Sequence, residues 1–242
     1  MTELRWRCCV HPDHPANRNT GGVPRRRRRS PVPVPTSAFA GFRFPPEVIT
    51  VAVRGDRRFG LSYRDVEELL AERGVEVDHV SVYRWVQRFT PLFADAARPS
   101  RHAAGDRWNV DETYVKVAGR WRYLYRAIDQ FGQVVDVYFS ERRDAGTARL
   151  FFSRAIASAQ VEPAEVVTDR AQAYPRVLDD LLPGARHDIE QYANNAIEAD
   201  HARLKARLRP MRGLKTAAGT RRISLGHALV QNLRRGRYEL GI

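Results

Sequence analysis

Two acidic residues lie in apolar runs of sequence where a carboxylate requires a partner. Asp111 lies inside NVDET, which has the composition of a strand, and Asp169 ends the apolar run VVTD. A carboxylate buried in an apolar strand costs several kcal/mol unless it is paired or bound to a metal ion. Two such carboxylates brought together repel each other, and a divalent cation relieves that repulsion. Mg²⁺ prefers oxygen ligands, so it suits these aspartates better than any set of His and Cys in the chain.

A third carboxylate comes from the stretch NNAIEADHARLKARLR, which has the pattern of a helix. Glu198 and Lys205 are seven residues apart in it and therefore share one face of the helix. That face offers a metal ligand followed by a phosphate anchor. Asp200 is expected to point away and to pair with Arg203 and Arg207, three and seven residues further on. We therefore take Glu198 as the third ligand.

Converging carboxylates of this kind can hold two divalent ions about 3.5–4 Å apart on either side of a phosphodiester. Such a pair activates a water or a 3′-hydroxyl and stabilises the leaving oxygen, so no covalent intermediate with the enzyme is required. A recombinase with a tyrosine or serine nucleophile is an alternative, but no Tyr or Ser stands beside a base or an arginine cluster at a recognisable spacing. His201, one helical turn after Glu198, either contacts the metal site or a phosphate, or packs within the fold.

The elements that must position these residues follow a strand-rich order. Strand-like runs at 108–117, 121–129 and 133–142 are separated by short turns, which predicts an antiparallel meander. The remaining pattern predicts a helix at 145–159, a buried strand at 164–169, a helix at 173–182, at most a short strand at 186–192, and helices at 194–209 and 225–240. This order predicts a mixed α/β sheet with helices on both faces. A right-handed crossover to 164–169 would set that strand parallel to the first one and bring Asp111 beside Asp169.

The segment before the sheet has the pattern of a helix-turn-helix unit. A first helix starts at Pro45–Pro46, a second starts at Ser62 and ends at Gly74, and a third begins after Asp78. Apolar side chains on the third helix share one face, and Ser81, Arg84 and Arg88 share another. We expect those three residues to contact DNA, although a helical bundle with a solvated charged face has a similar pattern.

Composition agrees with a polyanionic partner. The 242 residues contain 41 Lys+Arg and 28 Asp+Glu, which gives a formal charge of +13 and favours nucleic acid. No apolar run is long enough to span a membrane, and no signal peptide is apparent. The only cysteines, Cys8 and Cys9, do not form a disulfide scaffold, and their spacing with His11 and His14 matches no familiar zinc module. We expect a cytoplasmic, nucleoid-associated protein.

These patterns divide the chain into four parts. Residues 1–40, with GGVPRRRRRSPVPVP, are expected to be a disordered basic extension, which either grips DNA phosphates or has no function. Residues 41–92 form the helix-turn-helix domain, 93–105 a polar linker, and 106–242 the catalytic domain with its C-terminal helices.

Five stretches resemble the insertion-sequence-six family of DDE transposases: LSYRDVEELLAERGVEVDHVSVYRWVQRF, WNVDETYVKVAGRWRYLYRAID, VVTDRAQAYPRVL, YANNAIEADHARLKARLRPMRGLKT and GHALVQNLRRGRYEL. The resemblance implies a ribonuclease-H-like, retroviral-integrase-like catalytic domain with Asp111, Asp169 and Glu198 as its metal-binding triad and Lys205 as the basic residue seven further on. It implies Mg²⁺, with Mn²⁺ as a substitute. It also implies binding of the terminal inverted repeats, cleavage of the double-stranded element ends, attack of the freed 3′-hydroxyl on target DNA, and a homo-oligomer that synapses two ends.

The first helix departs from the family pattern. It contains Gly55, Asp56 and Arg57 where large apolar residues are expected, and glycine costs about 1 kcal/mol in a helix interior. We therefore expect the helix to be interrupted at Gly55.

Two alternative functions agree with parts of the pattern. A ribonuclease-H-like nuclease without strand transfer would use the same acids, but the added helix-turn-helix favours a transposase. A non-enzymatic DNA-binding regulator with a helix-turn-helix has no need of three convergent acids.

Overall fold

The computed structural model describes residues 37–169, 171–190, 194–211 and 213–239. All the helices and strands described below lie in the unit Ala38–Ile242. The predicted basic extension at 1–40 lies almost entirely outside the described residues, as do Cys8 and Cys9. No helix in the described part of the chain combines the length and the apolar character that crossing a membrane requires.

Three helices come first: α1 (Pro46–Phe59), α2 (Tyr63–Ala71) and α3 (His79–Ala97). Helix α2 begins with a capping box, in which the Ser62 hydroxyl accepts from the Asp65 amide and the Asp65 carboxylate accepts from the Ser62 amide. The Asp78 carboxylate caps α3 by accepting from the Ser81 amide at 2.9 Å. The predicted starts of the second and third helices are therefore confirmed, because both depend on local capping chemistry.

Helix α1 continues through Gly55, so the predicted interruption there is wrong. Asp56 and Arg57 are buried, and their side chains pair at 2.9 Å. Arg207 donates to the Asp56 backbone carbonyl at 3.1 Å and to its carboxylate at 3.3 Å. A Cβ at Gly55 would lie 3.2 Å from Cγ2 of Val66, so the glycine lets α1 approach α2 closely. Packing and ion pairing from distant elements thus offset the poor helix propensity.

Helix α3 extends into the predicted linker at 93–105. It runs to Ala97 and is followed by a 3₁₀ turn, η1, at Arg98–Ser100. Aromatic stacking supports this extension, because Phe39 stacks on Phe89 at 4.8 Å between ring centroids and Phe93 lies 5.9 Å from the same ring. The composition of the linker is polar, but its first residues bury apolar surface and stay helical.

The sheet has five strands: β1 (Arg107–Val117), β2 (Arg120–Asp129), β3 (Val134–Ser140), β4 (Glu165–Val167) and β5 (Arg186–Asp188). Their order is β3-β2-β1-β4-β5. The first three form the predicted antiparallel meander, and β4 and β5 run parallel to β1. Helix α4 (Ala145–Ala159) makes the crossover to β4. The ribonuclease-H-like mixed sheet predicted from the sequence is therefore confirmed.

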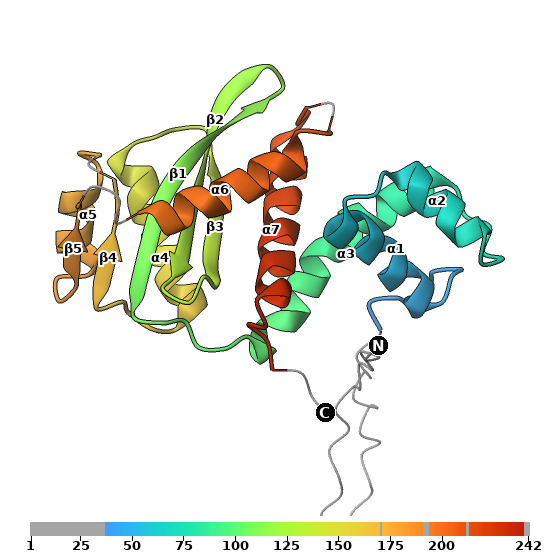
Figure 1. The fold of residues 1–242 in the computed structure, drawn as a ribbon, viewed down its shortest axis with the longest axis horizontal. Helices are drawn as coiled ribbons and strands as arrows, with labels where there is room; N and C mark the ends of the chain where they lie inside the picture. The colour runs from blue at the N-terminus through green and yellow to red at the C-terminus, as the bar shows by residue number, and fades with distance from the viewer. Residues whose placement is uncertain (1–36, 170, 191–193, 212, 240–242) are drawn as a thin grey trace, which may run out of the picture. The chain divides into compact units, whose positions relative to one another are not determined.

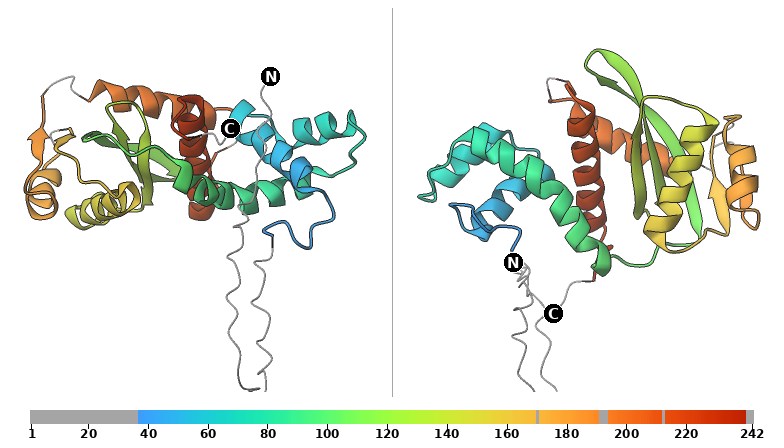
Figure 2. Two further views of the ribbon diagram at one scale, coloured as in Figure 1. Left: turned by 90° about the horizontal axis from the view of Figure 1, so that it is seen from below. Right: turned by 180° about the vertical axis from the view of Figure 1, so that it is seen from behind.

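Helices cover both faces of this sheet (Figures 1 and 2). Helices α4 and α5 (Tyr174–Leu181) pack on the face where Trp108 and Val110 are buried. Helices α6 (Asn195–Leu208) and α7 (Ala217–Arg234) cover the other face, where Val115 and Val117 pack against Leu204 of α6. Alternate residues of β1 thus face different helix layers.

Candidate active site

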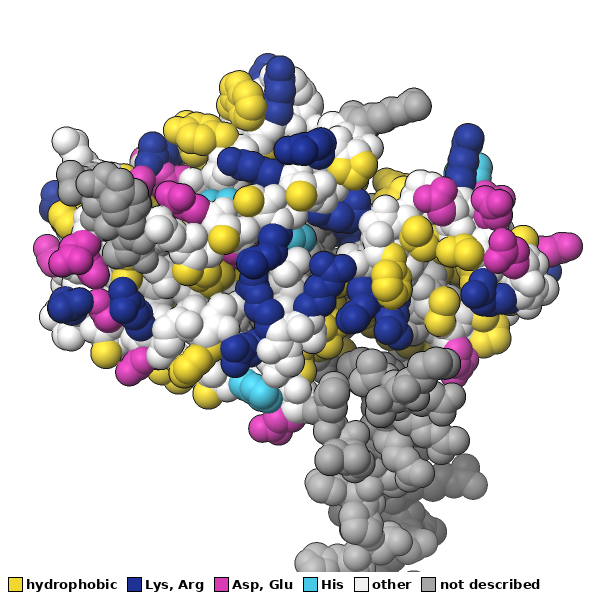
Figure 3. Space-filling model, viewed as in Figure 1, with side chains coloured by type: hydrophobic (Ala, Val, Ile, Leu, Met, Phe, Trp, Pro, Cys, Tyr) yellow, Lys and Arg dark blue, Asp and Glu magenta, His cyan; other side chains and the backbone are white. Residues whose placement is uncertain are grey.

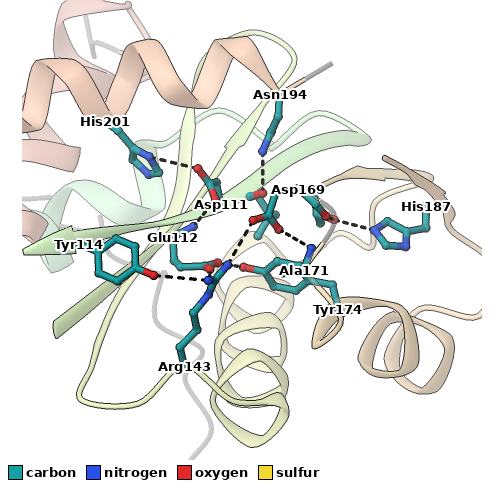
Figure 4. Close-up of polar contacts among 12 residues, drawn as sticks. Asp111, Glu112, Tyr114, Arg143, Asp169, Ala171, Tyr174, His187, Asn194 and His201 are labelled. Atoms are coloured by element: carbon teal, nitrogen blue, oxygen red, sulfur yellow. Dashed lines mark hydrogen bonds and ion pairs between the residues drawn. The ribbon is translucent and has the colours of Figure 1, made fainter. Parts of the chain in front are cut away.

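Neighbouring parallel strands bring Asp111 and Asp169 together. Strands β1 and β4 pair through Trp108 with Val166 and Asn109 with Val167. Two residues further along each chain are Asp111, still within β1, and Asp169, just after β4 ends. The Asp169 carboxylate accepts from the backbone amide of Ala171 at 3.1 Å, so the turn after β4 fixes its direction (Figure 4). The adjacency predicted from a right-handed crossover therefore follows from the observed register.

A third carboxylate in this group comes from the residue next to Asp111. Asp111, Glu112 and Asp169 each offer an oxygen, and these atoms lie within 4.8 Å of one another. Asp111 and Glu112 are consecutive in β1, so their side chains point to opposite faces of the sheet. Asp169 lies beyond the end of β4, where its carboxylate is close to both of theirs. Burial, together with the charges of Glu112, Asp169 and Glu198, raises the pKa of Asp111 to about 7. The site thus concentrates negative charge that a cation would relieve.

Helix α6 crosses β1 beside this group. Its first turn carries Glu198, which is exposed and close enough for its charge to raise the pKa of Asp111. His201 lies one turn later, with Nδ1 3.5 Å from Oδ2 of Asp111. Burial and the charge of Arg126 lower the pKa of His201 to about 4, so its imidazole is neutral near pH 7. Glu198 therefore lies beside the carboxylate group. The third residue whose oxygen lies within 4.8 Å of those of Asp111 and Asp169 is Glu112.

A buried ion network holds α6 in this position. The Asp200 side chain is fully buried and pairs with Arg126 of β2 and with Arg235, which follows α7. Burial alone would raise the pKa of Asp200, but Arg126 and Arg235 lower it below its ordinary value. The expected pairing with Arg203 is present at 3.8 Å, whereas Arg207 pairs with Asp56 of α1 instead. Asp200 is therefore a buried residue that joins α6 to β2 and to the end of α7, and only one of its two partners expected from the helical spacing, Arg203, pairs with it.

Comparisons with known proteins agree with this architecture. The profile of a family described as a DDE domain matches residues 105–237. The transposase for insertion sequence-like element IS431mec of Staphylococcus aureus is 38% identical over 183 residues, which span 74% of this chain and 81% of that protein. The S. aureus transposase for insertion sequence element IS257 in transposon Tn4003 is similar to the same extent. This chain belongs to the insertion-sequence-six family of DDE transposases.

Solved structures similar to this transposase include retroviral integrases. The HTLV-2 integrase catalytic core domain in complex with magnesium is 16% identical, with a TM-score of 0.40 over 52% of this chain and 86% of that chain. A simian T-cell lymphotropic virus intasome structure is 15% identical, with a TM-score of 0.42 over 73% of this chain and 66% of that chain.

The predicted DNA contacts of the transposase occupy different environments. Arg84 and Lys205 are exposed, on α3 and α6 respectively. Ser81 is half-buried, and its hydroxyl donates to the Asp78 carboxylate at 2.9 Å, so it acts in capping. The Arg88 guanidinium lies over the Phe42 ring, 5.4 Å from its centroid. Of the three predicted contacts on α3, Arg84 thus has the environment best suited to contact a ligand.

Sequence reasoning missed Glu112 and its partners. The Glu112 carboxylate pairs with Arg143 and accepts from the Tyr174 hydroxyl (Figure 4). The two adjacent acids in NVDET were the available signal, since a strand would bury one on each face. Arg143 lies in a charged loop, where nothing local distinguishes it from its neighbour Arg142.

Trp121 on β2 and Trp108 on β1 differ in their exposure, although both are aromatic strand residues. Trp121 is 62% exposed near the turn between β1 and β2, with the Lys116 ammonium 5.9 Å from its ring centroid. Trp108 is fully buried. The two tryptophans differ in exposure because Trp121 lies at the end of the β1–β2 hairpin, which extends past the covering helices (Figure 1).

Proposed function

We propose that this transposase binds the terminal inverted repeats of its insertion sequence and catalyses metal-dependent DNA cleavage and strand transfer with Asp111, Asp169 and Glu198. The observation that carries the proposal is the parallel register of β1 and β4, which sets Asp111 and Asp169 at adjacent positions. Helix α6 carries Glu198 in its first turn, and the charge of Glu198 contributes to the raised pKa of Asp111, which supports its inclusion. Family membership supports the reaction class, and the acid geometry supports the residues.

The donors fit Mg²⁺, with Mn²⁺ as a substitute, because Asp111 and Asp169 bring carboxylate oxygens within 4.8 Å of each other and hard cations prefer such ligands. Asp111, Asp169 and Glu198 would hold the metal, which when bound acts as a Lewis acid on the scissile phosphodiester. The neutral His201 imidazole lies against Asp111 and limits how its carboxylate can turn. Lys205, two helical turns after Glu198, is positioned along α6 to anchor a DNA phosphate.

Two surfaces support DNA as the partner. On α3 the exposed side chains include Val80, Tyr83 and Arg84, a mixture suited to a major groove, so we propose that α2 and α3 form the helix-turn-helix reader. Lys and Arg side chains also gather over the region of α6 and α7 (Figure 3). The exposed members on those two helices are Arg203, Lys205, Arg221 and Arg234. Joining two element ends at one target requires two catalytic sites, so we propose a homo-oligomer in the synaptic complex.

The test uses the full chain with duplexes that carry the element ends and a target plasmid, in Mg²⁺ or Mn²⁺. We expect Asp111→Asn to abolish cleavage and joining while end binding is unchanged. Asp95→Asn, an exposed aspartate on α3, is the matched control and should remain active. Calorimetry with Mn²⁺ should show weaker binding to Asp111→Asn than to the control. Joining by Asp111→Asn at the rate of the unmodified protein would reject the assignment.

The same assay separates strand transfer from hydrolysis alone. An end that is already cleaved and carries a free 3′-hydroxyl should be joined to the plasmid, giving a covalent product of higher mass. Release of nicked DNA without any joined product would favour the ribonuclease-H-like nuclease. Because Asp111→Asn is expected to bind ends normally, loss of binding in that variant would point to misfolding, which its melting temperature would reveal.

A further inference from the structure

Arg143 reaches into the carboxylate group from a loop that the triad does not use. It lies between β3 and α4, and its guanidinium contacts three side chains of the site (Figure 4). Nε pairs with the Glu112 carboxylate, Nη2 lies 3.3 Å from Oδ2 of Asp169, and Nη1 lies 3.5 Å from the Tyr114 hydroxyl. The positively charged guanidinium of Arg143 is therefore held at the edge of the group formed by Asp111, Glu112 and Asp169.

Glu112 is suited to hold Arg143 in place and poorly suited to bind a metal. Its side chain is 2% exposed, and one oxygen pairs with Arg143 while the other accepts from the Tyr174 hydroxyl. Burial raises the pKa of Glu112, and the hydrogen bond from Tyr174 and the charge of Arg143 oppose that rise. Both oxygens are thus engaged on the α5 side of β1, whereas Asp111 faces α6.

Arg143 keeps donors available for a further partner. A guanidinium has five N–H donors, and the contacts with the described residues engage one on each nitrogen. One N–H on Nη1 and one on Nη2 remain, and the side chain is 35% exposed. A planar guanidinium with an N–H to spare on each Nη is able to bind two oxygens of one phosphate as a fork.

We propose that Arg143 is a catalytic residue that contacts the non-bridging oxygens of the scissile phosphate, with Glu112 and Tyr174 as its positioning residues. The proposal rests on the assignment of Asp111, Asp169 and Glu198 above, since that assignment locates the phosphate. Negative charge on the non-bridging oxygens is stabilised during phosphoryl transfer by a preorganised guanidinium. Glu112 and Tyr174 hold the guanidinium from the α5 side of β1, so its orientation is set before the phosphate binds.

The experiment measures single-turnover joining of an already cleaved end at saturating DNA. We expect Arg143→Ala to slow joining by about 100-fold, the usual effect of removing one transition-state donor. Arg143→Lys keeps the charge but loses the planar fork, so most of the loss should persist. Arg142→Ala, its exposed neighbour in the same loop, is the matched control and should join at the unmodified rate. All three variants should remain folded by circular dichroism and should bind element ends as the unmodified protein does, although Arg143→Ala should melt at a lower temperature because it leaves the buried Glu112 without its cation.

A second readout separates direct contact from a structural role. One non-bridging oxygen of the scissile phosphate is replaced by sulfur, in each stereoisomer, on the target strand that is attacked. Because the fork contacts both non-bridging oxygens, sulfur in either isomer replaces one of its acceptors, so each isomer should slow the unmodified protein more than it slows Arg143→Ala. Glu112→Gln should reduce the rate less than Arg143→Ala and keep the sulfur effect, because the fork is loosened but present.

Two results would overturn the inference. Equal sulfur effects in Arg143→Ala and the unmodified protein would show that Arg143 does not contact the phosphate. Joining by Arg143→Ala at the rate of Arg142→Ala would show that the ion pair only stabilises the loop. Asp111→Asn distinguishes failure of this inference from failure of the proposed function. If Asp111→Asn is inactive and Arg143→Ala is active, only the role of Arg143 is rejected. If Asp111→Asn is active, the metal site itself is rejected.

Discussion

The substitution Asp200→Asn should destabilise the transposase strongly, because it removes the counter-charge of a fully buried arginine. The Arg126 and Asp200 side chains are both fully buried. The other described contact of the Arg126 guanidinium is His227 Nδ1 at 3.3 Å. Burial and neighbouring charge lower the pKa of His227 to about 3, so this imidazole is neutral near pH 7 and cannot replace the aspartate, which is anionic. The substitution therefore leaves an uncompensated charge in the core between β2, α6 and α7.

The size of the loss follows from the exposure of each pair. Breaking a buried ion pair by removing one partner costs about 3–5 kcal/mol. Arg203 lies 3.8 Å from Asp200 and is 54% exposed, so that pair contributes at most about 1 kcal/mol. Arg235 is 19% exposed and can reach solvent once released. We therefore expect the free energy of unfolding to fall by about 3–5 kcal/mol, or by roughly 6–20 °C in melting temperature for a chain of this size.

Urea denaturation near pH 7, followed by tryptophan fluorescence and circular dichroism, measures this loss. The matched control is Asp95→Asn, which removes an exposed aspartate paired with Arg98 at 3.1 Å. That change should cost less than about 0.5 kcal/mol. A loss of less than about 1 kcal/mol in Asp200→Asn would refute the reasoning, because it would mean that Arg126 finds water or another partner when its aspartate is neutralised.

Two further predictions concern α7. The pKa of His227, lowered to about 3 by burial and by Arg126, lies below the 6.5 of a free imidazole, so between these values the unfolded chain binds a proton that the folded chain does not. The contribution of His227 to the unfolding free energy is then fully present above about pH 6.5 and is lost as the pH falls. The variant His227→Gln should therefore show a weaker pH dependence of the unfolding free energy between about pH 6.5 and 4. An unaltered slope would contradict this prediction. A Cβ at Gly226 would lie 2.8 Å from Cδ of Arg57 and 2.8 Å from Cγ2 of Thr90. Gly226→Ala should therefore lower the unfolding free energy by about 1–3 kcal/mol, although alanine has the better helix propensity. An unchanged melting temperature would contradict this prediction.

Local sequence determined most of the elements and much of the site. Ser62 and Asp78 cap their helices through hydrogen bonds that span three residues, so the helix starts could be predicted from the residue types. The β-branched and aromatic residues of β1 and the short turn after it predicted the meander in the same way. Asp111 and Asp169 were found because a carboxylate in an apolar strand is costly, and the register of β1 with β4 brought them together as expected.

Tertiary structure decided the features that depend on residues far apart in the chain. Asp56 is stabilised in α1 by Arg207, 151 residues away, and no local rule could foresee that the helix would continue through Gly55. Asp200 became a core anchor because Arg126 lies opposite it across the α6–β2 contact, which helical spacing alone cannot indicate. The sequence by itself therefore determined the starts of α2 and α3, the meander and the candidacy of Asp111 and Asp169, because capping and strand propensity act within a few residues. The partners of those residues were decided only by the packing of the sheet against α6 and α7, because ion pairs join side chains wherever the fold brings them together.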